Sequence, residues 1–399
     1  MTVFGTRPEA IKLAPVIREL QRRGADGPVE SVVCVTAQHR QMLDQVLDLF
    51  TLQPDYDLAV MEENQTLAGV AAAVLTRLEP VLARERPDWV LVQGDTTTVA
   101  AAALAAYYAG ARVGHVEAGL RTWDKWRPFP EEINRRVAGV VADCHFAPTA
   151  QARHNLLAER VPAEQVVVTG NPVIDALRWV ADLDAPAEAR TILRRAGLGA
   201  ASSPGEARLI VVTAHRRESF GQPLEDVCLA LREVARRGAG GVQIVYAVHL
   251  NPNVWEPVHR LLGDEPGVTL VPPVAYSTLV HLLKRAYLVL TDSGGIQEEA
   301  PGLAVPVLVL REVTERPEAV DAGTVRLVGT DRERIQAETD RLLADPAAHA
   351  AMSRAVNPYG DGLASQRIVA ALLGEAVEPF EPRPTGCRGS AASVAGGSQ

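Results

Sequence analysis

Five short motifs combine acidic, basic and glycine residues in a way that suits chemistry on an anionic substrate. They are Gly5-Thr-Arg-Pro-Glu9, Gln93-Gly-Asp-Thr96, His115–Arg121, Thr213–Glu218 and Asp292–Glu299. Each follows a short apolar run that predicts a β-strand. Because open α/β sheets bind ligands at the carboxyl ends of their strands, the motifs predict one site assembled from two halves of the chain.

Three carboxylates in the first half are candidates for acid/base catalysis. Asp95 and Glu117 lie at the ends of predicted strands, and Glu131 lies in the segment Arg127–Glu132. Carboxylates that share a crevice repel each other, which raises the pKa of at least one and makes it a usable general acid. Any one of them could instead pair with a nearby arginine, but together they favour catalysis. Spacing alone does not distinguish Glu131 from Glu132.

A second group of residues suits phosphate binding. Ser293, Gly294 and Gly295 follow a predicted strand and precede a helix, so their N–H groups lie where a pyrophosphate is favoured. The helix is predicted to open at Ile296. Glu299, one turn later, can accept hydrogen bonds from ribose hydroxyls, as the acid of dinucleotide-binding folds does. By itself the motif could equally be a simple corner between a strand and a helix.

Basic residues at two other strand ends could complete the phosphate site. Arg7 follows the first predicted strand and presents a planar guanidinium to phosphate oxygens, with Lys12 on the next helix. His215, Arg216 and Arg217 follow a strand of the second half. A lone arginine beside an acid is more often part of a surface ion pair. Three donors in a row at a strand end are harder to explain as solvated surface.

The elements expected to position these motifs alternate between strands and helices, which is typical of parallel sheets. The first series of strands comprises Thr2–Phe4, Ser31–Thr36, Trp89–Gln93, Arg112–Glu117, Cys144–Ala147 and Val166–Thr169. The second series comprises Leu209–Thr213, Val242–Ala247, Val268–Leu270, Leu288–Thr291 and Val305–Leu310. The polar stretch Asp182–Glu206 between the two series is typical of a surface helix and linker.

The length of 399 residues predicts two domains, since single cores stop growing near ~250 to 300 residues. We expect an N-terminal α/β domain over residues 1–170, which contains the acids, and a C-terminal α/β domain over residues 171–356, which contains the phosphate site. A helix over Ala364–Leu373, within 357–375, should pack back on the first domain. Residues 376–399 are rich in Pro, Gly, Ser and Ala and should be disordered.

Composition and missing motifs exclude several classes of function. A net charge of −9 argues against a general binder of nucleic acid or membrane surfaces, because those partners favour basic faces. The four cysteines show no Cys-x-x-Cys pair and no metal-ligand spacing, which predicts a cytoplasmic protein without structural zinc. Neither G-x-G-x-x-G after the first strand nor a Walker loop is present, so we expect no nucleotide cofactor. The longest small apolar run is too short to span a membrane.

The motifs closely resemble those of the bacterial non-hydrolysing UDP-N-acetylglucosamine 2-epimerases over residues 1 to about 375. The similar segments are Gly5–Lys12, Thr36–Asp44, Gly94–Thr98, His115–Thr122, Pro130–Glu132, Ala214–Glu218, Asp292–Pro301 and Thr314–Glu318. So many ordered motifs make a chance match implausible. Hydrolysing relatives typically replace Pro-Glu of the first motif with an Ala-Asp type sequence, so Pro8 and Glu9 favour the non-hydrolysing branch.

The resemblance implies a GT-B-like fold of two Rossmann-type domains and a homodimer. It also implies cofactor-free interconversion of UDP-GlcNAc and UDP-ManNAc, which supplies sugars for cell-surface polysaccharide. The C2 proton of the sugar is not acidic, because no carbonyl adjoins that carbon. Family members therefore first lose UDP from C1, and a carboxylate then removes the C2 proton to give 2-acetamidoglucal. UDP adds back with protonation from the opposite face.

The resemblance also implies roles for individual residues. The catalytic group comprises Asp95, Glu117, Glu131 and His215. The UDP-binding group comprises Arg7, Lys12, Ser293, Gly294, Gly295, Glu299, Tyr276 and Arg316. An activator site for a second UDP-GlcNAc comprises Gln38, Gln41, Gln65, His249 and Arg217, together with Glu131. Which acid serves which face of C2 is left open, and His215 could be a phosphate donor instead of a proton shuttle.

Two positions depart from the family pattern. Asn64 stands where many members have arginine, which removes a charge from the activator site and predicts weaker activation. Leu279 stands where some relatives place an aromatic ring near uracil, and Tyr276 or the backbone near Val274 would compensate.

Three other functions could use the same UDP site. A GT-B glycosyltransferase would need an acceptor groove, and the acids count against it. A non-catalytic UDP-sugar sensor is disfavoured because all three acids are intact. An epimerase of a modified UDP-hexosamine stays open, because the motifs do not reveal the pocket for C6.

Overall fold

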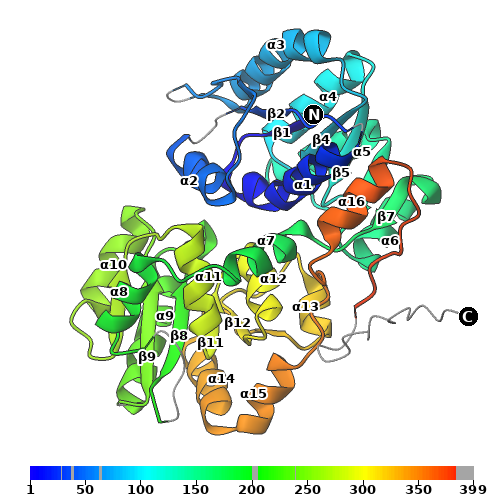
Figure 1. The fold of residues 1–399 in the computed structure, drawn as a ribbon. Coiled ribbons are helices and arrows are strands. Elements are labelled where there is room, and N and C mark those ends of the chain that lie inside the picture. Colours follow the sequence, from blue (N-terminus) through cyan, green and yellow to red (C-terminus); the bar gives the residue numbers. More distant parts are fainter. Residues whose placement is uncertain (28, 37–39, 63–64, 200–204, 239, 383–399) are drawn as a thin grey trace, which may run out of the picture.

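The computed structural model describes the chain apart from residues 28, 37–39, 63–64, 200–204, 239 and 383–399 (Figure 1). Two α/β domains, each built on a parallel sheet, lie against each other. Within the described residues, no helix is both long enough and apolar enough to cross a membrane.

The first sheet is formed from seven strands. They are β1 (Thr2–Phe4), β2 (Val33–Val35), β3 (Tyr56–Asp57), β4 (Trp89–Gln93), β5 (Arg112–Val116), β6 (Cys144–Ala147) and β7 (Val166–Val168). Their order is β3-β2-β1-β4-β5-β6-β7. The helices of this domain are α1 (Arg7–Asp26), α2 (Arg40–Phe50), α3 (Leu67–Glu85), α4 (Thr97–Tyr108), α5 (Glu131–Val141) and α6 (Ala150–Ala158), with a short 3₁₀ turn over Ala163–Gln165.

The second sheet is formed from six strands. They are β8 (Arg208–Thr213), β9 (Val242–Ala247), β10 (Val268–Val271), β11 (Leu288–Thr291), β12 (Val307–Val309) and β13 (Val325–Leu327), in the order β10-β9-β8-β11-β12-β13. Its helices are α9 (Gln222–Arg237), α10 (Pro252–Leu262), α11 (Tyr276–Arg285), α12 (Gly294–Gly302), α13 (Pro317–Asp321), α14 (Arg332–Ala344) and α15 (Pro346–Ser353). A 3₁₀ turn over Arg217–Ser219 follows β8.

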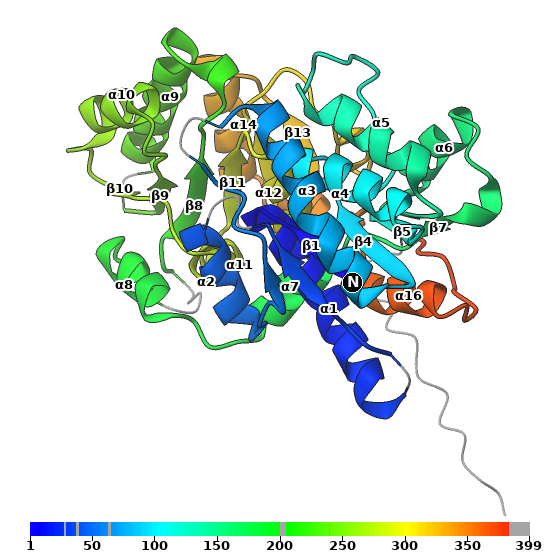
Figure 2. The same ribbon diagram turned by 90° about the horizontal axis from the view of Figure 1, so that it is seen from above.

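Helices α7 (Pro172–Ala181), α8 (Ala187–Arg195) and α16 (Ala364–Leu372) complete the chain. Helix α7 contacts α1 of the first domain and α11 and α12 of the second, and the two views show α1 and α7 side by side (Figures 1 and 2). Their facing side chains form one apolar cluster in which Ile17, Leu177 and Leu283 are fully buried. Helix α16 packs on α1 and α7, far from its neighbours in sequence.

The order of the strands in each sheet indicates where a ligand site should lie. In the first sheet the order changes direction between β1 and β4, and in the second between β8 and β11. A crevice opens at such a point beyond the carboxyl ends of the two strands, because the following helices leave toward opposite faces. The segments that follow these strands contain Arg7, Asp95, His215 and Asp292. Four of the five sequence motifs therefore lie directly at the two switch points.

Every apolar run predicted as a strand contains one, and four are shorter than predicted: Arg112–Glu117 and Val166–Thr169 each lose their last residue, and two others lose more. Ser31–Thr36 is reduced to Val33–Val35, and Val305–Leu310 to Val307–Val309. The strands β3 and β13 were not predicted from the sequence. Helix α12 begins at Gly294, two residues before the predicted Ile296, so the glycines belong to its first turn.

Candidate active site

Glu117, at the end of β5, is held from two sides. Its Oε2 accepts a hydrogen bond from Gln93 Nε2 at 2.6 Å and contacts the ammonium of Lys12. The backbone of Glu117 has a φ of 63°, which is uncommon for a residue with a side chain. The residue is buried, so its carboxylate is fixed in position and direction.

The charge of Glu117 depends on these neighbours. Burial alone would raise the pKa of its carboxyl, but the positive charges of Lys12 and Arg316 outweigh burial and lower the pKa. Burial likewise opposes the charge of Lys12, yet the carboxylates of Glu117 and Glu298 keep the pKa of the ammonium above its ordinary value. Both groups are therefore ionised at neutral pH.

Asp95 is held by helix α5. Its carboxylate forms an ion pair with Arg135, and its backbone carbonyl accepts a hydrogen bond from Asn134 Nδ2 at 3.0 Å. The loop after β4 and the start of α5 are thus joined. This places Asp95 next to the turn of helix that contains the third candidate acid.

The two adjacent glutamates at the start of α5 have different surroundings. Glu132 is fully buried and accepts hydrogen bonds from the backbone N–H groups of Thr122 at 3.1 Å and Trp123 at 3.2 Å. Its Oε2 also accepts a hydrogen bond from Arg135 Nη1 at 3.3 Å. Glu131 has a buried Oε2 for which the described residues supply no hydrogen-bond partner. Glu132 therefore fixes the loop, and Glu131 has the carboxylate that is free to act on a ligand.

A fourth carboxylate, Glu9, connects two loops of the site. Its Oε2 accepts the backbone N–H groups of Gly5 at 2.9 Å and Thr6 at 2.6 Å, which caps helix α1. Its Oε1 accepts the hydroxyl of Thr96 at 2.6 Å. Because Thr96 follows Asp95 directly, the loop that precedes Arg7 and the loop that contains Asp95 are fixed to the same side chain.

Arg7 faces the second domain. Burial lowers the pKa of its guanidinium, and the nearby Glu299 and Tyr276 oppose this effect. Burial raises the pKa of Glu299 to about 7. The arginine of the first domain and the predicted ribose ligand of the second thus lie within electrostatic reach of each other.

The start of α12 leaves room for a ligand at one of its two glycines. A side chain at Gly294 would lie 2.5 Å from Arg316 Nη1, whereas one at Gly295 would meet nothing closer than Glu299 Oε2 at 3.9 Å. Ser293 is the residue that precedes the helix, and its side chain makes no capping hydrogen bond. The first N–H groups of the helix are therefore available to an anion.

His215 is positioned by Asp292, which is completely buried at the end of β11. Asp292 Oδ2 accepts the backbone N–H groups of His215 at 2.6 Å and Arg216 at 2.7 Å, and Oδ1 lies 3.3 Å from His215 Nδ1. Partial burial lowers the pKa of His215 despite this carboxylate, so the ring is neutral at pH 7. The ring of His249 stacks on it with centroids 5.6 Å apart.

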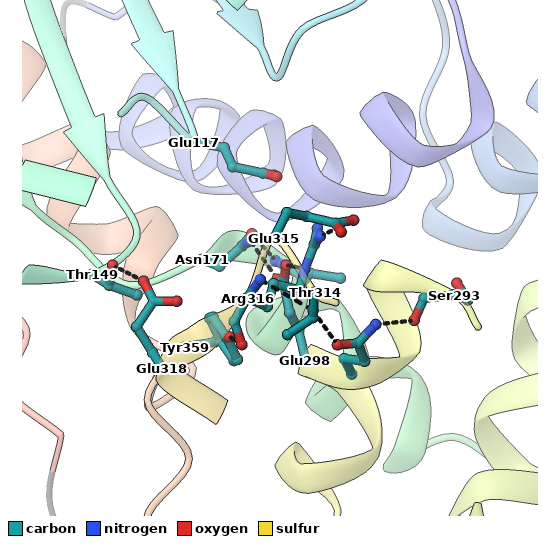
Figure 3. Close-up of polar contacts among 12 residues, drawn as sticks. Glu117, Thr149, Asn171, Ser293, Glu298, Thr314, Glu315, Arg316, Glu318 and Tyr359 are labelled. Carbon is teal, nitrogen blue, oxygen red and sulfur yellow. Dashed lines mark hydrogen bonds and ion pairs between the residues drawn. The ribbon is translucent and has the colours of Figure 1, made fainter. Parts of the chain in front are cut away.

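Arg316 lies in a buried cluster between the domains (Figure 3). Its guanidinium contacts Glu298 and donates to Glu315 at 2.8 Å. Burial opposes this charge, but the surrounding carboxylates raise the pKa of Arg316 further. Asn171, which caps α7, donates to Glu298 at 2.6 Å. The charge of Arg316, which was predicted to be in the UDP-binding group, is thus already balanced by two acids.

A second contact crosses between the domains beside this cluster. Thr149 Oγ1 of the first domain donates to Glu318 Oε1 of the second at 2.8 Å (Figure 3).

The predicted activator site is only partly visible. Gln38 and Asn64 lie outside the described residues, and Gln41 is described only as a position in α2. Gln65 has a buried Oε1 without a hydrogen-bond partner among the described residues. Arg217 is exposed beside His215.

Several residues of the site were not assigned a role from the sequence. Gln93 holds Glu117, Arg135 holds Asp95, and Asp292 holds His215. Gln93 and Asp292 lie inside motifs recognised from the sequence, and their positions at strand ends could have indicated that they belong to the site. The partner of Asp95 could not be chosen among neighbouring arginines without the course of α5.

Two facing α/β domains, with carboxylates at one carboxyl edge and a glycine-rich helix start at the other, define a protein of the GT-B-like fold class. A family model described as UDP-N-acetylglucosamine 2-epimerase matches residues 20–373. The chain belongs to this family, whose members are isomerases.

Individual relatives agree with the family match. The chain is 55% identical over 372 residues to the UDP-N-acetylglucosamine 2-epimerase of Salmonella typhimurium, covering 93% of this chain and 97% of that one. It is similar to the crystal structure of the Neisseria meningitidis enzyme bound to UDP-GlcNAc, with 46% identity, a TM-score of 0.85 and coverage of 94% and 99%. The Methanocaldococcus jannaschii enzyme in complex with UDP-GlcNAc and UDP is 31% identical, with a TM-score of 0.76 and coverage of 94% and 99%.

Proposed function

We propose that this protein interconverts UDP-GlcNAc and UDP-ManNAc by eliminating UDP and adding it back, without releasing free ManNAc. The observation that carries the proposal is the set of acids at the first carboxyl edge. Glu117 is held ionised by Lys12 and Arg316, and Glu131 has an unpaired buried oxygen. One fixed carboxylate and one free carboxyl are the two groups that removal and return of a proton at C2 require.

The binding half of the proposal rests on the second domain. The pyrophosphate would lie against the first turn of α12 at Ser293–Gly295, with Arg7 reaching it from the first domain. Glu299 would hold the ribose, and Tyr276 would lie near the uracil. His215 is neutral, which lets it donate a hydrogen bond to the departing phosphate without a charge of its own. UDP is thereby retained while the glycal intermediate exists.

One assay tests this function. The protein is incubated with UDP-GlcNAc in D₂O, and the products are followed by NMR. We expect UDP-ManNAc with deuterium at C2, because the proton removed from carbon exchanges with solvent. Free ManNAc would place the protein in the hydrolysing branch. Unlabelled substrate without any epimer would contradict the proposal.

We further propose that UDP-GlcNAc activates the enzyme from a second site that includes Gln65 and His249. The stacking of His249 on His215 supports this, because a ligand beside one ring would contact the other. UDP-ManNAc alone should then be a poor substrate until a trace of UDP-GlcNAc is added. Full activity without the trace would mean that the change to Asn64 has removed the activation.

We propose that the enzyme works as a homodimer in the cytoplasm and supplies ManNAc-type sugars for polysaccharide. Apolar side chains on the outer faces of α4 and α5 support a dimer, since Tyr107, Tyr108 and Val140 are 60%, 73% and 85% exposed. These helices pack against each other, so the residues lie in one region of the first domain. Sedimentation velocity should give twice the mass of one chain, and a monomer at micromolar concentration would contradict the dimer.

A further inference from the structure

Lysine is rare in this chain, which makes the position of each one informative. Only Lys12, Lys125 and Lys284 are lysines among 40 basic residues, and the other 37 are arginines. Lys125 and Lys284 are exposed, whereas the side chain of Lys12 is only 12% exposed. An ammonium is a compact point charge, while a guanidinium is a wide planar fork. At the enclosed position 12, this arginine-rich chain therefore has the compact ammonium of a lysine instead of a guanidinium.

Lys12 is directed at a carboxylate. Its ammonium and the amide of Gln93 both contact Oε2 of Glu117. Neither donor uses Oε1. Two donors on the same oxygen fix the rotation of the carboxylate and leave the other oxygen to accept a proton.

Other charges around this carboxylate act in the same direction. Arg316 faces it from the second domain and Arg135 from α5, and both favour its ionised form. Glu298 faces Lys12 and stabilises the ammonium. Lys12 is the cation in direct contact with Glu117, so its removal should affect the carboxylate most.

We propose that Lys12 is a positioning residue that, with Gln93, holds Oε2 of Glu117 so that Oε1 takes the C2 proton, and that Lys12 does not bind the phosphates of UDP. This inference rests on the proposed function. As the C1–O bond breaks, UDP leaves with its electron pair. The C2–H electron pair forms the C1–C2 double bond, and the proton passes to Oε1. Lys12 keeps its own proton throughout.

The pH dependence of Lys12→Met tests the proposal. Without the ammonium, Glu117 should need a higher pH to ionise, so the acid limb of kcat/KM should move up by about one pH unit. At pH 7, kcat should fall about tenfold or more and recover in part at pH 9. The dissociation constant for UDP, measured by calorimetry, should change less than about threefold. Lys284→Met, the same substitution at an exposed site of the second domain, should leave all three quantities unchanged.

Lys12→Arg is the second variant, and it retains the positive charge in case Lys12→Met does not fold. A guanidinium is a good phosphate ligand but cannot occupy the compact site at Oε2, so we expect UDP affinity to be kept and kcat to fall about tenfold. Two results would overturn the proposal. One is a loss of UDP affinity of tenfold or more in Lys12→Met with an unmoved acid limb, and the other is a normal kcat in Lys12→Arg. Failure of the proposed function would appear separately, as absence of epimer with the unaltered protein.

Discussion

The carboxyl edges of the two sheets differ in the groups that make their polar contacts. At the first edge, side chains hold side chains: Glu117 is fixed by Lys12 and Gln93, and Asp95 by Arg135. At the second edge, backbone N–H groups are the main hydrogen-bond donors. Helix α12 begins with two glycines, and the N–H group of His215 donates to Asp292. In the proposed function, this difference corresponds to proton transfer at the first edge and anion binding at the second.

The sharpest test of this division is the removal of the acids. Asp95→Asn, Glu117→Gln and Glu131→Gln should each lower kcat by ~10² or more, because each removes a proton acceptor or donor. UDP affinity, measured by calorimetry, should change far less. A loss of UDP binding as large as the loss of kcat would break the division between the two edges.

Glu132→Gln is the matched control for Glu131→Gln. An amide cannot accept from both Thr122 and Trp123 while facing Arg135, so the free energy of unfolding should fall by about 1–3 kcal/mol. Its kcat should fall less than that of Glu131→Gln, which should retain normal stability. Reversed behaviour of the two variants would mean that Glu132 is the acid that acts on substrate.

A second test concerns the charge of Glu299. Burial raises its pKa from 4.5 to about 7, so the folded protein resists ionisation of this group. Its contribution to stability is greatest below pH 4.5 and is lost as pH rises to about 7, by about 3 kcal/mol for the isolated group. Glu299→Gln removes this loss, so the variant should gain stability relative to the unaltered protein between pH 5 and pH 8. The free energies of unfolding of both proteins are measured in urea at pH 5 and pH 8. If the difference between the two proteins is the same at both pH values, the pKa of Glu299 is not raised.

The glycines of α12 offer a third test, this time of the second edge. Gly295→Ala adds a methyl group with no protein atom closer than 3.9 Å, so the fold should be unaffected. A pyrophosphate close to the backbone would meet that methyl group, and we expect UDP affinity to fall about tenfold. Gly294→Ala should instead cost about 1–3 kcal/mol of stability, because the methyl group meets Arg316. Unchanged UDP affinity in Gly295→Ala would place the phosphate elsewhere.

The smallest expected effect on catalysis comes from the hydrogen bond between Thr149 of the first domain and Glu318 of the second. Glu318→Ala removes the 2.8 Å hydrogen bond from Thr149 and leaves the cap of α6 intact. We expect KM for UDP-GlcNAc to rise about two- to threefold with kcat nearly unchanged, since a single hydrogen bond contributes about 1 kcal/mol. A large fall in kcat would show that this contact between the domains also affects proton transfer.

The fold was largely predictable because buried parallel strands are continuous apolar runs. The run Trp89–Gln93 coincides with β4 at both ends. The two missed strands lie at sheet edges and lack such a run: β3 has only Tyr56 and Asp57, and β13 includes the exposed Arg326. Edge strands are held by pairing with one neighbour, which a local pattern does not reveal.

The types of site residue were predictable, but their pairing was not. Lys12 and Glu117 are 105 residues apart, so nothing near Lys12 in sequence indicates its partner. Glu131 and Glu132 are adjacent and chemically alike. They differ because the N–H groups of Thr122 and Trp123 meet only the second. The role of Lys12 as a UDP ligand therefore stays a prediction that competes with the positioning role proposed above.

The scarcity of lysine has a practical consequence. The two exposed lysines lie on different domains, Lys125 in the loop before α5 and Lys284 on α11, where its ammonium donates to the carbonyl of Ala181 at 2.6 Å. The amino group of Met1 is buried and donates to Trp89 at 2.7 Å. An amine-reactive dye should therefore label these two lysines, one on each domain, before the enclosed amines of Lys12 and Met1. A donor and acceptor pair on these two lysines would report any change in the distance between the two domains in single molecules without an engineered cysteine.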